Sequence, residues 1–353
     1  TQGEQGLLFE EKLKKTCDAQ FALAFCNATA ALHSACLSLN ITKHDTVWTS
    51  PISFVASANC VLYCGATIDF VDIDINTANM CPDALAVKLS KIQEKKDLPK
   101  AIIVVHMAGQ SCDMEKISQI CRPYNIKIIE DASHAIGGSF KDKKIGSCHY
   151  SDITIFSFHP VKIITTGEGG AALTNDDELA NKLRLFRSHG VTNDPAKMSE
   201  NHGPWYYQQL DLGHNYRMTD IQAALGVSQL DRLNDFIKTR NKLAKIYNKA
   251  FDDSIWQPLT QLKQSTSAYH LYIVRNSQWK KPEKLEIFNA LRNKGIQVHV
   301  HYIPIHMQPY YQKIGFKIGD YPNAERYYQE ALTLPIHPHL TEEQQKYIIE
   351  SVK

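Results

Sequence analysis

The sequence has neither a marked excess of charge of one sign nor a long apolar run. Lys and Arg together number 39 and Asp and Glu 37, which leaves a formal net charge of +2, and the basic residues are spread along the chain. We therefore expect no nucleic-acid partner, because such binding needs a basic patch or stripe. No apolar run approaches the roughly 18 residues of a membrane helix, so we expect no membrane span.

Paired cysteines are also missing. There are nine cysteines, an odd number, and none stands in a C-x-x-C pair. Cys26, Cys36, Cys60 and Cys64 lie inside apolar runs, where a free cysteine behaves as a small buried hydrophobe. This pattern indicates a reducing compartment and, with no visible signal peptide, predicts a cytoplasmic protein. Because the chain begins at Thr1 rather than Met, we expect a native N-terminal segment to precede it.

Strand-like and helix-like segments alternate up to about residue 190. The expected strands, such as AIIVV and DITIF, are apolar on both faces, which is typical of parallel strands covered on two sides. The alternation predicts an α/β architecture with a mainly parallel sheet. The expected strands are Phe21–Cys26, Thr46–Ser50, Ile68–Asp72, Ala101–His106, Ile126–Glu130, Ile153–Phe158 and Ala171–Thr174. Helices expected between them include Ala28–Leu39, Phe54–Tyr63, Asp83–Leu89 and Met114–Arg122.

The pattern changes in the last third of the chain. Thr219–Phe251 reads as one long helical stretch that bridges two units. We therefore predict a large domain over residues 1–235 and a small C-terminal domain over residues 236–353. The elements expected in the second are the strand Tyr269–Val274, the helix Lys284–Lys294, the strand Val298–Tyr302 and a final helix that starts at the capping box of Thr341 and Gln344.

The stretch FSFHPVKIITTGEGG places Lys162 in an apolar neighbourhood, just past the end of an expected buried strand. Burial lowers the pKa of a lysine and makes its free amine a nucleophile. One use of such an amine is a Schiff base with a carbonyl cofactor such as pyridoxal phosphate. The alternative is a lysine that extends to the surface near a strand end.

An acid that suits this cofactor follows another expected strand. Asp131 stands at the carboxyl end of Ile126–Glu130 in IIEDASHAIGG, and ligands of open α/β sheets bind at that edge. There it can face a pyridine nitrogen and keep the ring protonated, or it can simply cap a helix. His134, three residues further on, can face the same pocket or pack in the core.

The stretch CNATAALHSA can form a phosphate cup. It runs from a strand end into a helix, where the amides of Thr29 and Ala30 and the helix dipole favour a dianion. Ser157 can supply a further hydroxyl. Phe54 can stack on a pyridine ring, although a core phenylalanine is the more common explanation.

Taken together, these stretches resemble the sugar aminotransferases of the DegT/DnrJ/EryC1/StrS family. The resemblance implies a fold-type I pyridoxal phosphate enzyme of the aspartate aminotransferase type, with a large, mostly parallel sheet domain and a small C-terminal α/β domain. No single stretch is specific, but the combination is, and it extends along nearly the whole chain. The matching stretches are TQGEQGLLFEEKL, NATAALH, SPISFVASAN, EDASHAIGG, FSFHPVKIITTGEGGAALTND, LFRSHG, GHNYRMTDIQAALGVSQL, VHYIPIH and LPIHPHLTEEQ.

The resemblance also implies roles for individual residues. Asn215, in GHNYR, would reach the cofactor phosphate of a neighbouring subunit, so that a homodimer with shared active sites is expected. The remaining roles are a Schiff base at Lys162, a pyridinium partner at Asp131, a position beside the ring for His134, phosphate contacts from Thr29, Ala30 and Ser157, and stacking by Phe54.

The expected reaction is transamination of a sugar nucleotide. Relatives with histidine at the position of Lys162 dehydrate sugars, whereas this chain keeps the lysine. The amino-acid sequences of these motifs are most similar to those of the C4-transaminases of pseudaminic acid biosynthesis. By that resemblance, a UDP-linked 4-keto-6-deoxy-N-acetylhexosamine would receive an amino group from L-glutamate, with pyridoxamine phosphate as the cofactor's other form.

Substrate contacts are expected in VHVHYIPIH, where the resemblance puts Tyr302 and His306 near the sugar nucleotide. We expect no metal there, since no fourth ligand with metal spacing accompanies the three histidines. Arg187 and Arg217 can bind a carboxylate or diphosphate, or form surface ion pairs. The alternatives are a C3- or C4-transaminase of dTDP- or other UDP-linked keto sugars, another pyridoxal phosphate activity such as a dehydratase or amino-cyclitol transaminase, and a non-catalytic sugar-nucleotide-binding relative.

Overall fold

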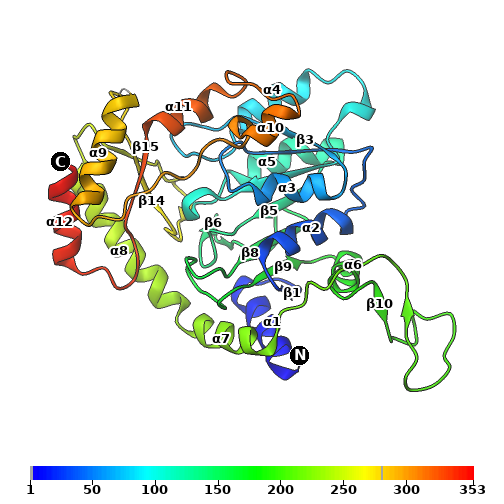
Figure 1. Cartoon of the computed structure of the whole chain (residues 1–353). Helices are drawn as coiled ribbons and strands as arrows, with labels where there is room; N and C mark the ends of the chain where they lie inside the picture. Colours follow the sequence, from blue (N-terminus) through cyan, green and yellow to red (C-terminus); the bar gives the residue numbers. More distant parts are fainter. Residues whose placement is uncertain (1–2, 280) are drawn as a thin grey trace.

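The computed structural model describes residues 3–279 and 281–353, and a seven-stranded sheet forms its centre (Figure 1). The strands run in the order β1-β9-β8-β5-β4-β2-β3. All neighbouring pairs are parallel except the two that involve β9. The predicted α/β class with a mostly parallel sheet is therefore confirmed. The strands are β1 (Phe21–Phe25), β2 (Thr46–Thr49), β3 (Thr67–Phe70), β4 (Ala101–Val105), β5 (Lys127–Asp131), β8 (Ile153–Ser157) and β9 (Gly170–Thr174).

Helices cover both faces of this sheet. In β1, Leu23 and Phe25 join one apolar cluster with α2, α3 and α6, whereas Ala22 and Ala24 join another with α1 and α7. Alternate residues of a strand point to opposite faces, so each face is apolar and must be covered. A third cluster packs α4 and α5 on β4 and β5. The helices are α1 (Glu4–Cys17), α2 (Ala28–Ser38), α3 (Ala56–Tyr63), α4 (Pro82–Ser90), α5 (Met114–Cys121), α6 (Asp177–Arg187) and α7 (Asp220–Asp231).

The C-terminal part forms a smaller α/β unit around a sheet of order β12-β14-β15. Helix α8 (Leu233–Phe251) leads into it: Leu233 and Phe236 pack in the cluster with α1, whereas Leu243 and Phe251 pack in the small unit. The division at residue 235 stays a prediction. The other elements of this part are β12 (Gln257–Pro258), β14 (Tyr272–Arg275), β15 (Ala331–Leu334), α9 (Lys281–Asn293), α10 (Pro309–Lys313), α11 (Pro322–Glu330) and α12 (Glu342–Val352).

Three expectations for the last third need correction. The single helix Thr219–Phe251 is two helices, α7 and α8, which meet at Arg232. Tyr269–Val274 is strand only from Tyr272 onwards. Val298–Tyr302 is not a strand, since only His299 bridges to Thr333. The chain then turns back to the large sheet, where the Ile305 N–H donates to the Pro51 carbonyl (2.8 Å). The capping box that starts α12 at Thr341 is present as predicted.

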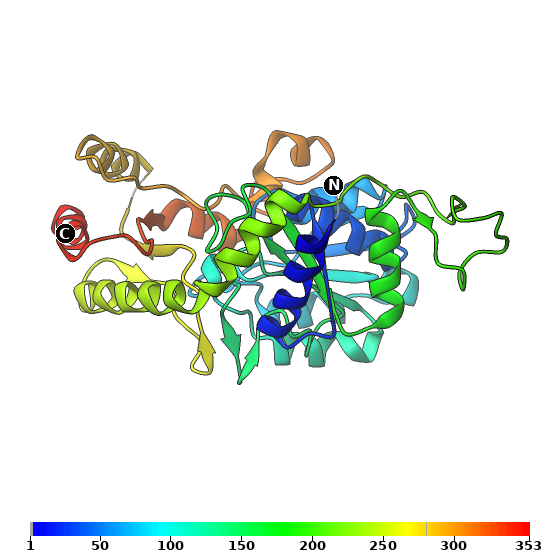
Figure 2. The ribbon, with the colours of Figure 1, turned by 90° about the horizontal axis from the view of Figure 1, so that it is seen from below.

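A hairpin arm, residues 188–213, stands out from the body in both views (Figures 1 and 2). It contains β10 (Val191–Thr192) and β11 (Gln208–Gln209), and exposes large apolar side chains such as Trp205 and Leu212. A further small sheet joins β13 (Ser265–Thr266), β6 (Ser139–Phe140) and β7 (Lys143–Lys144). None of the helices in the described residues has the length and apolar content that a membrane span requires. Thr1 and Gln2, which open the first family motif, lie outside the described residues.

Candidate active site

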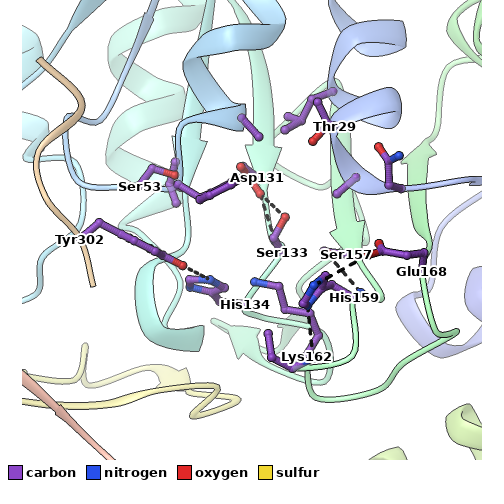
Figure 3. A pocket seen from close by; sticks show the side chains of 17 residues that line it. Thr29, Ser53, Asp131, Ser133, His134, Ser157, His159, Lys162, Glu168 and Tyr302 are labelled. Atoms are coloured by element: carbon purple, nitrogen blue, oxygen red, sulfur yellow. Dashed lines mark hydrogen bonds and ion pairs between the residues drawn. The ribbon is translucent and has the colours of Figure 1, made fainter. Parts of the chain in front are cut away.

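A cavity of about 280 Å³ opens at the carboxyl ends of β4, β5 and β8. Val105, Asp131 and Ser157, the last residues of these strands, line it. The small unit contributes Tyr302, so the cavity lies between the two parts of the chain (Figure 3). The other lining residues are Asn27, Ala28, Thr29, Leu32, Ser53, Phe54, Ala56, Ser133, His134, His159, Val161, Lys162 and Glu168.

Lys162 points into this cavity from the loop after β8 (Figure 3). Its backbone N–H donates to the His159 carbonyl (2.9 Å), which fixes the turn that carries it. Within the described part of the chain, its amine has no hydrogen bond or ion pair. Burial lowers the pKa of Lys162 to about 8, against an opposing effect of the Asp131 carboxylate. A free amine is therefore accessible near neutral pH, as a nucleophile or proton carrier requires.

Asp131 approaches the same cavity from the opposite side (Figure 3). Its Oδ1 accepts from the Ser133 hydroxyl (2.6 Å) and N–H (3.2 Å), and its Oδ2 from the Ser57 hydroxyl (2.6 Å). These three donors fix the orientation of the carboxylate. The acid is thus held in place where it can meet a ring nitrogen.

His134 connects the cavity to the small unit. Its Nε2 lies 3.3 Å from the Tyr302 hydroxyl, and the His270 ring packs 4.5 Å away, centroid to centroid. Burial, with Lys162 and His270 nearby, holds the pKa of His134 well below its usual value, so the ring is neutral. Its Nδ1 is buried and has no partner among the described residues. A group bound in this cavity can therefore use a neutral imidazole, not a cation.

The predicted phosphate cup stays a prediction, and the structure supports some of its residues but not Ala30. Asn27 is the N-cap of α2, and its side chain accepts from the Ala30 N–H (2.8 Å). Because the cap uses that amide, and because Ala30 does not line the cavity, the structure gives no support for Ala30 as an anion ligand. Ala28 and Thr29, in the first turn of α2, do line it, as does Ser157 across from them. Phe54 also lines the cavity and is 60% exposed, as a stacking residue would be before its ligand binds.

Besides Ala30, four predicted residues do not line this cavity. Arg187 pairs with Glu10 and donates to the Ala24 carbonyl (2.7 Å), which ties α6 to β1. His306 is fully buried, with its Nε2 2.9 Å from a Glu325 oxygen. Both side chains thus have partners inside the fold and lie outside the cavity, and their roles in substrate binding stay predictions.

The other two lie at the base of the hairpin arm. Arg217 lines a separate groove with residues of the arm, among them Tyr207 and Leu212. Asn215 is exposed and bridges to Ser188. Neither residue lines the cavity of its own chain, and both the role of Asn215 in a neighbouring subunit and the substrate contact of Arg217 stay predictions.

Several residues of the site did not enter the sequence prediction. His159 and Glu168 lie at the mouth of the cavity, with His159 Nε2 3.8 Å from a Glu168 oxygen. Ser53, Ser57 and Ser133 hold or adjoin Asp131. The sequence did contain a signal for the serines, since Ser133 follows Asp131 by two residues and Ser53 precedes Ser57 by one helical turn.

The residues present fit pyridoxal phosphate. A lysine amine with a lowered pKa faces a hydrogen-bonded carboxylate, a helix N-terminus offers an anion site, and a buried histidine nitrogen has no partner in the described residues. The described residues bring together no group of three or more His, Cys, Asp or Glu side chains arranged for a metal ion.

Comparison with known proteins agrees with this donor set. The model of the DegT/DnrJ/EryC1/StrS aminotransferase family matches residues 1–353. Among solved structures, PseC of Helicobacter pylori, an aminotransferase of pseudaminic acid biosynthesis, aligns with a TM-score of 0.90 and 35% identity over 100% of this chain and 91% of that one. The putative sugar aminotransferase Spr1654 of Streptococcus pneumoniae in its PLP-form aligns with a TM-score of 0.92 and 30% identity over 100% of this chain and 91% of that one.

Two groups of relatives differ in their named products. The UDP-4-amino-4,6-dideoxy-N-acetyl-beta-L-altrosamine transaminase of Campylobacter jejuni is 36% identical over 99% of this chain and 89% of its own length. The GDP-perosamine synthase of Escherichia coli O157:H7 is 35% identical over 98% of this chain and 88% of its own length. Both are similar to the chain to nearly the same degree, so the comparison does not decide between their sugars. The chain belongs to the DegT/DnrJ/EryC1/StrS family and is a sugar aminotransferase that depends on pyridoxal phosphate.

Proposed function

We propose that the protein transfers the amino group of L-glutamate to the C4 keto group of a UDP-linked 4-keto-6-deoxy-N-acetylhexosamine. The observation that supports the reaction type is the unpaired amine of Lys162, which shares one cavity with the hydrogen-bonded carboxyl group of Asp131. A protein that only binds a sugar nucleotide would not need this pair. The similarity to the altrosamine transaminases and to PseC supports the substrate.

The proposed steps of the reaction follow from the side chains that line the cavity. When bound, pyridoxal phosphate supplies an aldehyde that carries the amino group and a ring that withdraws electrons from the reacting carbon. Lys162 would hold it and, once displaced by glutamate, would remove the proton from the amino acid's α carbon. Asp131 would keep the ring nitrogen protonated, and Ala28, Thr29 and Ser157 would hold the phosphate. With the keto sugar, the same amine would return a proton to C4.

A second candidate is a transaminase for another keto sugar nucleotide. The similarity to GDP-perosamine synthase favours a GDP-linked 4-keto sugar as the alternative substrate. The sequence analysis also allows dTDP-linked sugars with a keto group at C3 or C4. The substrates share the reacting carbonyl and differ in the nucleotide and in the N-acetyl group. The contacts that separate them lie outside the lysine and the acid.

A panel of UDP-, GDP- and dTDP-linked keto sugars with L-glutamate tests the substrate. We expect the UDP-linked N-acetyl sugar to give a 4-amino product, identified by mass and by NMR, with the highest kcat/KM. A higher kcat/KM on the GDP- or dTDP-linked sugars would overturn the substrate and leave the transaminase intact. Borohydride reduction of the coloured enzyme should fix the cofactor on the peptide that contains Lys162; a colourless protein that cannot be reconstituted would contradict catalysis itself.

We further propose that two copies share each active site, with Asn215 acting in the neighbouring subunit. Asn215 is exposed and absent from its own cavity, and it follows the end of the arm by two residues. Mixed Lys162→Ala and Asn215→Ala subunits test this. In a heterodimer, one site would combine an intact Lys162 with an intact Asn215, so a random mixture should recover about a quarter of wild-type activity if Asn215→Ala alone is inactive. No recovery would place Asn215 in its own subunit's site.

We propose a cytoplasmic location for this enzyme. All nine cysteines are free thiols, six of them buried, as expected in a reducing compartment. Fractionation of the source cells with an antibody against the protein would test this, and recovery from an oxidising compartment would contradict it.

A further inference from the structure

Asp131 is held by a chain of two serines from the start of helix α3. The Ser57 hydroxyl donates to Asp131 Oδ2 (2.6 Å), and the Ser53 oxygen lies 2.7 Å from the Ser57 oxygen. All three residues are buried: Ser53 is 4% exposed, Ser57 1% and Asp131 5%. Such short contacts in a buried place are stronger than they would be in water.

The direction of this chain follows from the number of protons. An ionised carboxylate can only accept, and a serine hydroxyl has one proton to give. Because Ser57 gives its proton to Asp131, its oxygen must accept from Ser53. Ser53 lines the cavity, so the chain runs from the cavity wall to the acid.

Counting acceptor positions distinguishes the two oxygens of Asp131. Each carboxylate oxygen accepts about two hydrogen bonds. Oδ1 already has two donors, the Ser133 N–H and hydroxyl, whereas Oδ2 has one, Ser57. Oδ2 is thus the oxygen with an open position, and the Ser57 bond sets the direction in which that position points.

We propose that Ser57 is a positioning residue for Asp131: it holds Oδ2 as the oxygen that accepts the ring N–H of the cofactor, and Ser53 supports it by donating to Ser57. Without Ser57, the carboxylate would be fixed at Oδ1 alone and could rotate its second oxygen away from the ring. The inference rests on the role proposed above for Asp131. It does not depend on which sugar nucleotide the enzyme uses.

The test measures the affinity of the apoprotein for pyridoxal phosphate, by calorimetry, in a double-mutant cycle. We expect Ser57→Ala to raise the dissociation constant about tenfold, as for loss of a hydrogen bond to a charged group. In an Asp131→Asn background the same substitution should change it less than about twofold, because the effect passes through the carboxylate. Ser53→Ala should have a smaller effect, about threefold, with the same dependence on Asp131.

Ser38→Ala is the matched control, since Ser38 is equally buried and its hydroxyl donates to the Ser34 carbonyl in α2. It should leave the cofactor affinity unchanged. The absorbance of the loaded Ser57→Ala protein should also change with pH at a different midpoint from that of the wild type, which a merely structural serine would not cause.

The outcomes are distinguishable. If Ser57→Ala lowers the affinity for pyridoxal phosphate equally with Asp131 and with Asn at that position, Ser57 is structural and the inference is wrong. The inference is also wrong if Ser57→Ala leaves the affinity unchanged when Asp131 is intact. An unchanged affinity in Asp131→Asn itself would instead remove the proposed role of Asp131. If Ser57→Ala does not fold, the Ser53→Ala cycle decides by the same criteria.

Discussion

Two cations, the half-buried Lys162 in the cavity and the buried Arg240 in helix α8, differ in the groups that their hydrogens contact. Arg240 is 4% exposed, and its Nη1 donates to the carbonyls of Tyr269 (3.0 Å), His270 (3.3 Å) and Ile336 (2.9 Å). The amine of Lys162 donates to no group in the described chain. Burial lowers the pKa of Arg240 to about 10 and that of Lys162 to about 8.

This difference distinguishes a cation that stabilises the fold, Arg240, from one that is available for chemistry, Lys162. A cation that satisfies buried carbonyls stabilises the fold, because its removal would leave those acceptors without donors. A cation with unused hydrogens costs stability and persists where its reactivity is needed. Substitutions at the two positions should therefore have opposite consequences for activity and for stability.

The largest expected effect is on activity at Lys162. Lys162→Ala should lower kcat about 10⁴-fold, near the upper limit for loss of a positioned acid–base group, while the far-UV circular dichroism stays unchanged. Steady-state rates at saturating keto sugar and glutamate measure it. Activity within tenfold of wild type would show that another group moves the proton, and the comparison with Arg240 would lose its meaning.

The next effect is on stability at Arg240. Arg240→Met should lower the free energy of unfolding by about 3 kcal/mol, because it leaves buried carbonyls unpaired, and should change kcat per folded molecule only a few-fold. Urea titration measures it. Arg326→Met is the control: Arg326 is 58% exposed in its pair with Glu330, so its loss should cost under about 1 kcal/mol. Equal decreases in the free energy of unfolding for Arg240→Met and Arg326→Met would contradict a stabilising role of Arg240.

A gain in stability is expected when Lys162 loses its charge. Lys162→Met should stabilise the cofactor-free protein by about 2 kcal/mol at pH 7, after allowance for its partial exposure. With a folded pKa of about 8 and an unfolded one of about 10.4, the unfolded chain binds more protons between these values. Wild-type stability should thus rise through this window, and the difference from Lys162→Met should vanish near its upper end.

Urea titrations from pH 7 to 10.5 would follow this difference. If Lys162→Met raises the free energy of unfolding by the same amount at every pH, the increase is due to better packing. If it lowers the free energy of unfolding, Lys162 has a stabilising partner. Either result would remove the contrast between a cation that costs stability and one that supplies it.

Sequence alone predicted the cavity residues whose positions depend on the order of nearby strands and helices along the chain. Asp131 and Ser157 end parallel strands, and the carboxyl ends of such strands meet at one edge of the sheet. Thr29 follows from a strand that leads into a helix N-terminus. These positions are fixed by their neighbours in the chain, so apolar patterns and the family resemblance located them together.

The predicted residues that lie outside the cavity have contacts with other parts of the chain. Arg187 pairs with Glu10, 177 residues away, and His306 with Glu325 in α11. No pattern near either residue indicates its partner. The amide of Ala30 shows a more local failure: the sequence indicated a helix start there, but only the structure identified Asn27 as the cap that uses this amide. The spacing of Ser53 and Ser57 was visible in the sequence, but their connection to Asp131 became apparent only once α3 lay beside β5.

The smallest expected effect concerns His306, a neighbour of Tyr302 in sequence but not in environment. His306 is fully buried and paired with Glu325, whereas Tyr302 lines the cavity and contacts His134. His306→Gln should therefore leave the KM for the keto sugar nucleotide within about twofold and lower the free energy of unfolding by about 1 kcal/mol. Tyr302→Phe, matched in the same segment, should alter KM or kcat about fivefold through the lost contact with His134. If His306→Gln raises KM more than Tyr302→Phe does, then a buried, partnered side chain can still govern binding, and partnering would no longer separate structural residues from functional ones.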